Sequence, residues 1–295
     1  MQYRKKTFGK IVNYISNLQA FHRQVKESIY NENSDTIMEL GAGHLNDLRI
    51  WSKKKIKNVI AIEFDEPSII KGKENYAKLK SSMVLPNIEY VHCDLRKDTA
   101  KVIEKYKNKR GMINHIIANF SIHFFLENKE TIDGIAKLVR FFLKKGGTFK
   151  FTSLDGELIY NKFKRNEISR GNNIKVVDLG PEAIGFKDIV DINETEENTI
   201  FFREKNLDYF KIQRLYNVDE AFGPTGQLIN VYIISIGMAH NEYLVNVNYL
   251  KKKFELIGLR LTTKKSFANY KKNDIVLTQA EKDYSDLEVF VEFTS

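Results

Sequence analysis

The sequence has one cysteine, Cys93, and six histidines, and no two of these histidines stand at the short spacing of a zinc site. One cysteine cannot form an internal disulfide or a thiolate metal cluster, and it suits a reducing compartment. A structural zinc site is therefore not expected. Apolar runs are short as well: none approaches the ~20 residues that span a bilayer, and the basic N-terminus has no apolar segment behind it. We expect a soluble, cytoplasmic protein that binds no metal.

Apolar and charged residues are plentiful. The 295 residues are 42% hydrophobic and 12% aromatic, which is enough for the core of one large domain or two smaller ones. Lys and Arg outnumber Asp and Glu by 47 to 38, and the pI is near 9.2. This surplus of nine positive charges would attract a polyanion such as nucleic acid. On charge alone, a lysine-rich composition without any polyanionic partner explains the surplus equally well.

Short apolar segments alternate with longer helical patterns along the first half of the chain. The predicted strands are 36–40, 59–62, 88–93, 113–118 and 148–152. The predicted helices between them are 46–54, 67–80, 99–106 and 127–143. The first thirty residues have the spacing of one or two amphipathic helices with basic outer faces. This alternation predicts a parallel sheet covered by helices on both faces.

The segment 164–219 interrupts this pattern, because it is charged and weakly periodic. We expect it to form an inserted β-rich or irregular lobe. A strand at 228–236, a helix at 248–257 and a last strand at 287–293 follow, and we expect them to add an antiparallel end to the same sheet. The chain is therefore predicted to be a single domain in four parts: an N-terminal basic helical segment (1–34), a cofactor-binding core (35–163), the lobe (164–219) and the C-terminal part of the sheet with a substrate-binding loop (220–295).

The first predicted strand runs into a glycine turn, MELGAGHLNDL at 38–48. In a doubly wound sheet the ligand lies at the carboxyl ends of the strands, and this turn is its main contact. The turn lacks the third glycine of a dinucleotide fingerprint and the lysine of a phosphate loop. Glu39 and Asp47, on either side of the glycines, would repel a pyrophosphate but suit a ligand with an ammonium and a sulfonium group, such as S-adenosylmethionine.

Acidic residues also end the next two predicted strands. Glu63 could accept hydrogen bonds from both ribose hydroxyls, and Asp94 could accept one from the adenine amino group. Each feature alone has an ordinary explanation, since tight turns and solvated acids are common in α/β domains. Together, and in this order, they predict a class I (Rossmann-like) S-adenosylmethionine-dependent methyltransferase fold with a mostly parallel seven-stranded sheet.

The residues near the later strands bear on which atom is methylated. Methylation of the adenine amino group usually needs prolines after the fourth strand, where this sequence reads NFSI at 119–122. Methylation of a cytosine carbon needs a cysteine nucleophile, and Cys93 lies on a strand that should be buried. A ribose hydroxyl needs a base, for which Lys150 is the one suggestive candidate. N7 of guanine has a free lone pair and needs only placement against the methyl group, so the lack of an evident base mildly favours it.

Five stretches resemble the mRNA cap guanine-N7 methyltransferases, especially the methyltransferase domains of capping enzymes from large cytoplasmic DNA viruses. They are FHRQVK at 21–26, ELGAGHLND at 39–47, NFSIHFFLE at 119–127, KGGTF at 145–149 and EYLV at 242–245. The third and fifth are the most specific. The resemblance runs from about residue 21 to residue 293 and is weakest at 164–219.

The resemblance implies a complete cofactor site. S-adenosylmethionine would be bound by Lys26, Glu39, Gly41, Ala42, Gly43, Asp47, Glu63, Asp94, Leu95 and Asn119. In this arrangement Lys26 would meet the methionine carboxylate and Glu39 the ammonium group. Glu63 and Asn119 replace an Asp and a Gln that members of the family usually have.

The resemblance also implies a cap-binding set: His22, His44, His123, Phe124 and Glu242. His123 would face the guanine, and Glu242 would accept from its N1–H and N2–H edge. His22 and His44 stand where the family has an Asn and a phosphate-binding Lys, and a neutral histidine attracts a triphosphate less than lysine does. The late tyrosine of the family, which stacks on guanine, has no matching position, although Tyr284 is nearby.

We therefore predict transfer of a methyl group from S-adenosylmethionine to N7 of the guanosine cap, by in-line displacement without a catalytic base. The expected partner is the capped 5′ end of mRNA, and triphosphatase and guanylyltransferase domains could precede this one on the same polypeptide. The expected location becomes the host cytoplasm if the protein is viral. Two alternatives stay open: another class I methyltransferase acting on RNA or a small molecule, and an inert methyltransferase-like subunit that binds RNA or stimulates a partner.

Overall fold

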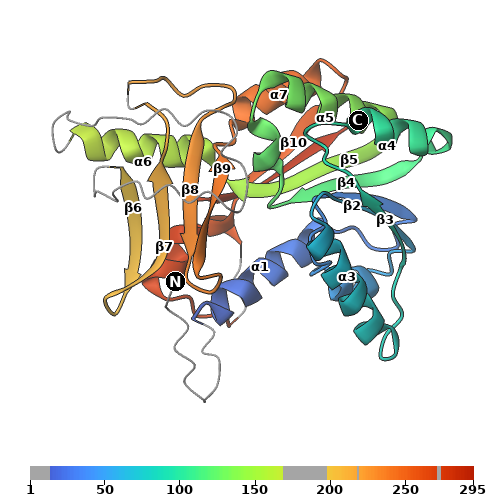
Figure 1. The fold of residues 1–295 in the computed structure, drawn as a ribbon, viewed down its shortest axis with the longest axis horizontal. Coiled ribbons are helices and arrows are strands. Elements are labelled where there is room, and N and C mark those ends of the chain that lie inside the picture. Colours follow the sequence, from blue (N-terminus) through green and yellow to red (C-terminus); the bar gives the residue numbers. More distant parts are fainter. Residues whose placement is uncertain (1–13, 169–197, 218, 271–273) are drawn as a thin grey trace.

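The computed structural model describes residues 14–168, 198–217, 219–270 and 274–295. Figure 1 shows a large twisted sheet with helices on both faces beside a smaller sheet. The large sheet has the strand order β10-β11-β5-β4-β1-β2-β3. Its strands are β1 (Thr36–Leu40), β2 (Asn58–Glu63), β3 (Asn87–His92), β4 (Ile113–Asn119), β5 (Leu143–Leu154), β10 (Arg260–Ser266) and β11 (Glu288–Thr294).

The pairing of these strands confirms the predicted sheet. β1 to β5 pair in parallel, whereas β11 runs antiparallel to both β5 and β10. The central strand β1 is buried on both faces: Met38 and Leu40 belong to one core cluster, and Ile37 belongs to another. A strand buried on both faces reads as a continuous apolar run, which is why the short segment TIMEL could be recognised as a strand.

Helices cover each face of this sheet (Figure 1). On one face lie α4 (Thr99–Lys105), α5 (Lys129–Phe142) and α7 (Val247–Glu255), whose apolar residues pack into the largest core cluster. On the other face lie α2 (Leu48–Lys53) and α3 (Glu66–Lys80). The N-terminal helix α1 (Ser16–Ile29) follows the predicted amphipathic spacing and turns its apolar face toward the second sheet. The part of the predicted helical segment before residue 14 lies outside the described residues.

The smaller sheet is an antiparallel meander of β6 (Thr199–Glu204), β7 (Leu207–Arg214), β8 (Leu228–Ile233) and β9 (Met238–Tyr243). The prediction that the run at 228–236 joins the large sheet was wrong, because β8 pairs with β7 and β9. Ile229 and Val231 on β8 pack against a core formed with α1 and α8 (Gln279–Ser285). The local pattern revealed a strand, but its pairing partners are set by distant residues. Most of the predicted lobe, 169–197, lies outside the described residues.

Several helices and one strand of the large sheet were not predicted from the sequence. The edge strand β10 reads RLTTKKS and leaves alternate residues exposed, so it carries little apolar signal. α6 (Gly156–Ile168), the 3-10 segments η1 (Lys107–Lys109), η2 (Ile122–Leu126) and η3 (Phe267–Asn269), and α8 were also not predicted. Among the helices in the described ranges, none is both long enough and apolar enough to cross a membrane.

Candidate functional site

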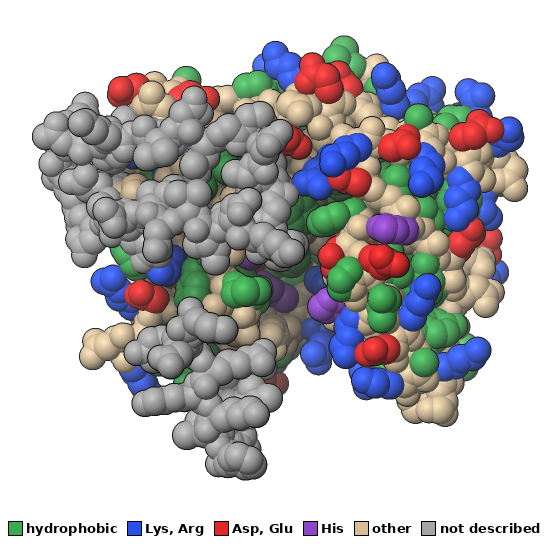
Figure 2. Space-filling model, viewed as in Figure 1, with side chains coloured by type: hydrophobic (Ala, Val, Ile, Leu, Met, Phe, Trp, Pro, Cys, Tyr) green, Lys and Arg blue, Asp and Glu red, His purple; other side chains and the backbone are tan. Residues whose placement is uncertain are grey.

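Two adjoining cavities lie where the parallel strands end. The smaller has a volume of about 240 Å³ and is bordered by the segments that follow β1, β2, β3 and β4. The larger, of about 420 Å³, is bordered by α1, η2, the second sheet and α8. Phe120 and Phe124 line both cavities and form their common wall. Figure 2 shows histidine side chains between the half of the molecule that contains α3 and the half that contains β6 to β9.

The glycine turn borders the smaller cavity. Gly41 has a φ of 76° and Gly43 a φ of 50°, the left-handed region that favours glycine. A Cβ on Gly41 would lie 2.6 Å from the Cβ of Ser121 in the loop after β4. The N–H of Gly43 donates to Oε2 of Glu63 at 2.8 Å. The turn is therefore held by contacts to the ends of two neighbouring strands, and it leaves backbone exposed in the cavity wall.

Glu63 fixes the end of β2 from inside this cavity. Its Oε1 accepts from the backbone N–H groups of Phe64 at 2.8 Å and Asp65 at 2.9 Å. The side chain is buried and lines the smaller cavity. A carboxylate has about four acceptor positions. The three backbone donors, including Gly43, therefore leave capacity for a ligand hydroxyl.

Asp94, the acid after β3, is already paired with Arg96. The Nε of Arg96 lies 2.9 Å from Oδ1, and its Nη2 lies 2.9 Å from Oδ2. Burial opposes ionisation of Asp94, but the bonds from Arg96 outweigh it and hold the pKa below its ordinary value. Asp94, Leu95 and Arg96 all line the smaller cavity. Arg96 was not singled out from the sequence, although its position two residues after the acid was a usable signal.

Four predicted cofactor residues meet around a residue that the sequence analysis missed, Tyr30. Its phenol oxygen lies 3.0 Å from Oε2 of Glu39 and 2.9 Å from Oδ2 of Asp47. The Nδ2 of Asn119 donates to the same phenol at 2.9 Å. The Nζ of Lys26 lies 2.9 Å from Oδ1 of Asp47 and 6.0 Å from the ring centre of Phe120. This polar cluster therefore lies beside the common wall of the two cavities.

The electrostatics of the cluster follow from its burial. Burial raises the pKa of Glu39 well above its ordinary value, the charge of Asp47 raises it further, and Lys26 opposes the shift. Burial and the same two acids also raise the pKa of the Tyr30 phenol. An added cation beside these acids would relieve their repulsion. The cluster therefore suits a ligand that carries an ammonium group.

Imidazoles, carboxylates and aromatic rings line the larger cavity. Four of the predicted cap residues lie there: His22, His123, Phe124 and Glu242. The same wall contains further polar residues that were not predicted as site residues, among them His240, Tyr284 and Glu288. Despite these imidazoles and carboxylates, the described residues hold no group of three or more His, Cys, Asp or Glu side chains placed to bind a metal ion.

Glu242 on β9 lies between two histidines. Its Oε2 is 3.5 Å from Nδ1 of His123, and its Oε1 is 2.7 Å from Nε2 of His240. Burial opposes ionisation of Glu242, but the two imidazoles hold its pKa below the ordinary value. Burial lowers the pKa of His123, and the charge of Glu242 opposes this shift. Neither ring nitrogen of His123 has a hydrogen-bond partner within the described part of the chain, although the side chain is buried. A buried polar ring without a partner is expected to meet a ligand.

Six predicted site residues line neither cavity: the four of the polar cluster, and also Ala42 and His44. His44 is exposed, and its carbonyl accepts from Nδ2 of Asn75 at 2.9 Å. Ala42 is partly buried, and its N–H donates to the carbonyl of Ile62 at 2.9 Å. Ala42 thus shapes the glycine turn through its backbone, while the structure does not bring His44 to the other cap residues.

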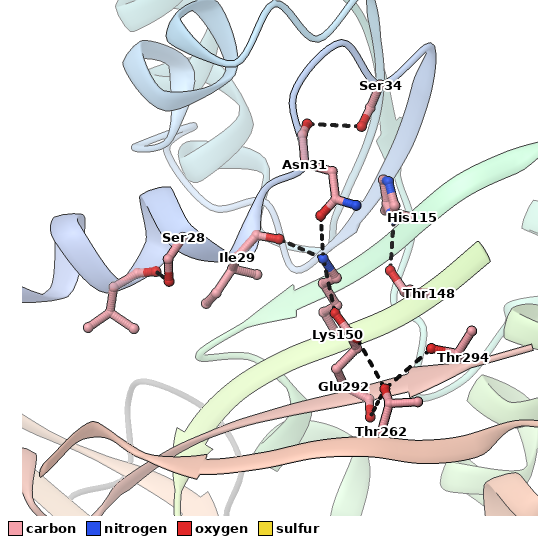
Figure 3. A network of polar contacts seen from close by, with 11 residues as sticks. Ser28, Ile29, Asn31, Ser34, His115, Thr148, Lys150, Thr262, Glu292 and Thr294 are labelled. Carbon is pink, nitrogen blue, oxygen red and sulfur yellow. Dashed lines mark hydrogen bonds and ion pairs between the residues drawn. The ribbon is translucent and has the colours of Figure 1, made fainter. Parts of the chain in front are cut away.

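Lys150, the candidate base from the sequence, anchors α1 (Figure 3). Its Nζ donates to the carbonyl of Ile29 at 2.7 Å and to Oδ1 of Asn31 at 2.7 Å. Oε2 of Glu292 lies 3.2 Å away. Burial lowers the pKa of Lys150, and Glu292 opposes the shift. Because α1 supplies Lys26 and His22, this anchor positions both parts of the site.

The sequence is similar to proteins of known family. The model of the mRNA (guanine-N(7))-methyltransferase domain family matches residues 3–185. The mRNA-capping enzyme of African swine fever virus is 27% identical over 271 residues, which cover 86% of this chain and 28% of that protein. The mRNA cap guanine-N(7) methyltransferase of Saccharomyces cerevisiae is 24% identical over 269 residues, which cover 87% of this chain and 53% of that protein. The chain thus spans between about a quarter and a half of the length of these relatives.

Solved structures show the same fold. A crystal structure of an S-adenosylmethionine dependent methyltransferase from Mesorhizobium loti superposes with a TM-score of 0.51 and 11% sequence identity. The superposition covers 94% of this chain and all of that one. The chain therefore has the fold of S-adenosylmethionine-dependent methyltransferases, to which it adds a four-stranded antiparallel sheet.

Proposed function

This chain belongs to the mRNA (guanine-N(7))-methyltransferase family, and from this membership we propose that it transfers a methyl group from S-adenosylmethionine to N7 of the guanosine cap of RNA. One observation carries the proposal: a cavity at the strand ends shares the wall of Phe120 and Phe124 with a second cavity that holds His123 and Glu242. Methyl transfer requires two ligands side by side, and the two cavities provide that arrangement.

The smaller cavity suits the cofactor. The space beside Gly41 has no room for a side chain, and the exposed backbone there can approach a ligand closely. Glu63 would accept from the ribose, and Asp94 with Leu95 would border the adenine. Glu39, Asp47, Lys26 and Asn119 would hold the methionine end. When bound, S-adenosylmethionine supplies an electrophilic methyl group on a sulfonium.

The larger cavity suits the guanine base. Glu242 would accept from the N–H edge of the base, and its lowered pKa keeps it ionised for that purpose. His123 would offer its unpartnered ring nitrogens, and Phe124 would pack beside the base. The lone pair of N7 is free in neutral guanine, so the site needs no base and acts by proximity and orientation. Buried carboxylates would also favour the positive charge that forms on the ring.

The substrate must already carry a cap. Triphosphatase and guanylyltransferase activities must therefore act first on the RNA, on the same polypeptide or on another one. The basic surplus of the chain would attract the RNA. We place the reaction in the cytoplasm, or in the host cytoplasm if the protein is viral.

A methylation assay with capped and uncapped short RNAs tests the proposal. Wild type should methylate only capped RNA, and nuclease digestion should place the methyl group at N7 of the cap guanine. Gly41→Val should abolish activity through loss of cofactor binding, and His123→Ala should raise KM for capped RNA. Equal methylation of uncapped RNA, or a methyl group at another atom, would point to a different class I methyltransferase. Absence of S-adenosylmethionine binding in calorimetry would point to an inert subunit.

A further inference from the structure

The larger cavity contains a second buried carboxylate, Glu288, which the proposed function leaves unused. Glu288 begins β11 in the seven-stranded sheet and is 2% exposed. Glu242 lies on β9 in the four-stranded sheet, and both side chains line this cavity. Two carboxylates from separate sheets therefore border the same space.

These carboxylates oppose each other electrostatically. Burial raises the pKa of Glu288, and the negative charge of Glu242 raises it further. His22 acts in the opposite direction and lowers the pKa. Nε2 of His22 lies 2.7 Å from Oε2 of Glu288. One imidazole N–H occupies at most one of the roughly four acceptor positions of a carboxylate. Glu288 thus retains acceptor capacity in the cavity wall, where N–H groups of a bound base could use it.

The proposed reaction brings positive charge to this cavity. When N7 of guanine takes the methyl group, its lone pair forms the new bond, and the sulfur–methyl bond breaks with its electron pair left on sulfur. The positive charge thereby moves from sulfur to the purine ring. Groups that stabilise charge where it develops lower the barrier, provided that they bind the charged form better than the neutral one. Two carboxylates in the wall of the base cavity meet this condition.

We propose that Glu288 is a further substrate-binding residue, and that together with Glu242 it makes the cavity prefer the cationic, N7-methylated guanine ring over the neutral ring. This inference rests on the proposed function, because it takes guanine as the occupant. The competing interpretation is that the pair of His22 and Glu288 only fastens α1 to β11. The two interpretations predict different behaviour for variants of the pair.

The test compares the affinities of the full chain for two cap analogues. Calorimetry with S-adenosylhomocysteine present would measure binding of a 7-methylguanosine-capped dinucleotide and of its unmethylated counterpart. Glu288→Gln removes the charge and keeps the shape, and the preference for the methylated analogue should fall about tenfold. Glu255→Gln, at an exposed carboxylate on α7, is the matched control and should keep the wild-type preference.

His22→Gln separates binding from a structural role. The variant keeps the carboxyl group of Glu288 in the cavity wall. Loss of His22 raises the pKa of Glu288 further, but a bound cationic ring favours the ionised carboxylate, so the preference for the cationic ring should hold. A structural pair predicts instead that His22→Gln and Glu288→Gln reduce the preference alike, and that result would overturn the proposal. If Glu288→Gln does not fold, His22→Gln alone tests the proposal. An unchanged preference for the methylated analogue supports the proposal, and a reduced preference contradicts it.

The outcomes also separate this inference from the proposed function. A wild-type preference in Glu288→Gln would overturn the role of Glu288, while the proposed function would stand if wild type methylates capped RNA. If wild type neither methylates capped RNA nor binds either analogue, the proposed function fails. Loss of the preference in both Glu242→Gln and Glu288→Gln, with wild-type affinity for S-adenosylhomocysteine, would support the shared role.

Discussion

Tyr30 and Asp47 are joined by a 2.9 Å contact between the phenol oxygen and Oδ2, and the same phenol oxygen lies 3.0 Å from Oε2 of Glu39. A phenol has one proton to donate, so it can donate to only one carboxylate. The second short contact requires a proton on the carboxylate itself. Because burial raises the pKa of Glu39 well above its ordinary value, we infer that Glu39 carries this proton.

Tyr30→Phe removes the bridge and leaves two acids and the Asn119 amide without their shared partner. We expect the free energy of unfolding to fall by about 1–3 kcal/mol, and S-adenosylhomocysteine to bind more weakly. Urea denaturation and calorimetry would measure the two effects. Tyr76→Phe is the control, because it removes a hydroxyl that donates to the carbonyl of Pro86, away from the cluster. Equal cofactor affinity in the two variants would contradict a role for Tyr30.

Glu39 should make stability depend on pH. Its folded pKa lies above the ordinary value of 4.5, so the folded state binds a proton more tightly than the unfolded state does. This contribution is fully present below about pH 4.5 and is lost as the pH rises through the folded pKa. Relative to Glu39→Gln, wild type should therefore lose stability as the pH rises. Urea denaturation at several pH values would test this, and a constant difference would contradict it.

Cofactor binding should release protons from the same cluster. An ammonium group beside Glu39 favours the ionised carboxylate, so the proton that we assign to Glu39 should leave on binding. Calorimetry with S-adenosylhomocysteine in buffers of different ionisation enthalpy would count the protons released. Glu39→Gln cannot release this proton and serves as the control. A proton count that is the same in the variant and in wild type would refute the assignment.

The two glycines of the turn should differ in their tolerance of alanine. The backbone φ is 76° at Gly41 and 50° at Gly43. A Cβ added at Gly41 would lie 2.6 Å from the Cβ of Ser121, whereas a Cβ added at Gly43 would have no other atom within 4 Å. Gly43→Ala should cost only the backbone strain, about 1–2 kcal/mol. Gly41→Ala should cost more, because a clash is added to that strain, and it should also weaken cofactor binding. Thermal unfolding of both variants would check the order, and a more harmful Gly43→Ala would reverse it.

Lys150→Met tests the anchor of α1. The substitution keeps an unbranched side chain but leaves Glu292 and the carbonyl of Ile29 without their buried cation. We expect a loss of about 3 kcal/mol in the free energy of unfolding, with weaker binding in both cavities because α1 loosens. Lys57→Met, which removes an exposed ion pair with Asp35, is the control and should change stability little. A base role would instead abolish activity and leave stability intact.

The parallel sheet could be predicted because its strands carry their own signal. Segments such as TIMEL are buried on both faces, so their composition is enough to identify them as strands. Glu63 and Asp94 directly follow two of the predicted strands. Residues at the carboxyl ends of neighbouring parallel strands must converge, so the order of the strands was enough to place Gly41, Glu63 and Asp94 in one site. The family resemblance added His123 and Glu242, which the structure brings together in one cavity.

The remaining features depend on contacts between distant parts of the chain. β8 shows strand periodicity, but only packing against α1 and α8 decides that it joins the second sheet. Tyr30 and Glu288 have no motif, and they gain their roles from partners on other elements or from the cavity that they line. Local sequence patterns are sufficient to specify the parallel sheet and the acids at its strand ends. Only the tertiary structure placed Glu288 and Glu242 around one cavity, because burial and the approach of two sheets are properties of the folded chain.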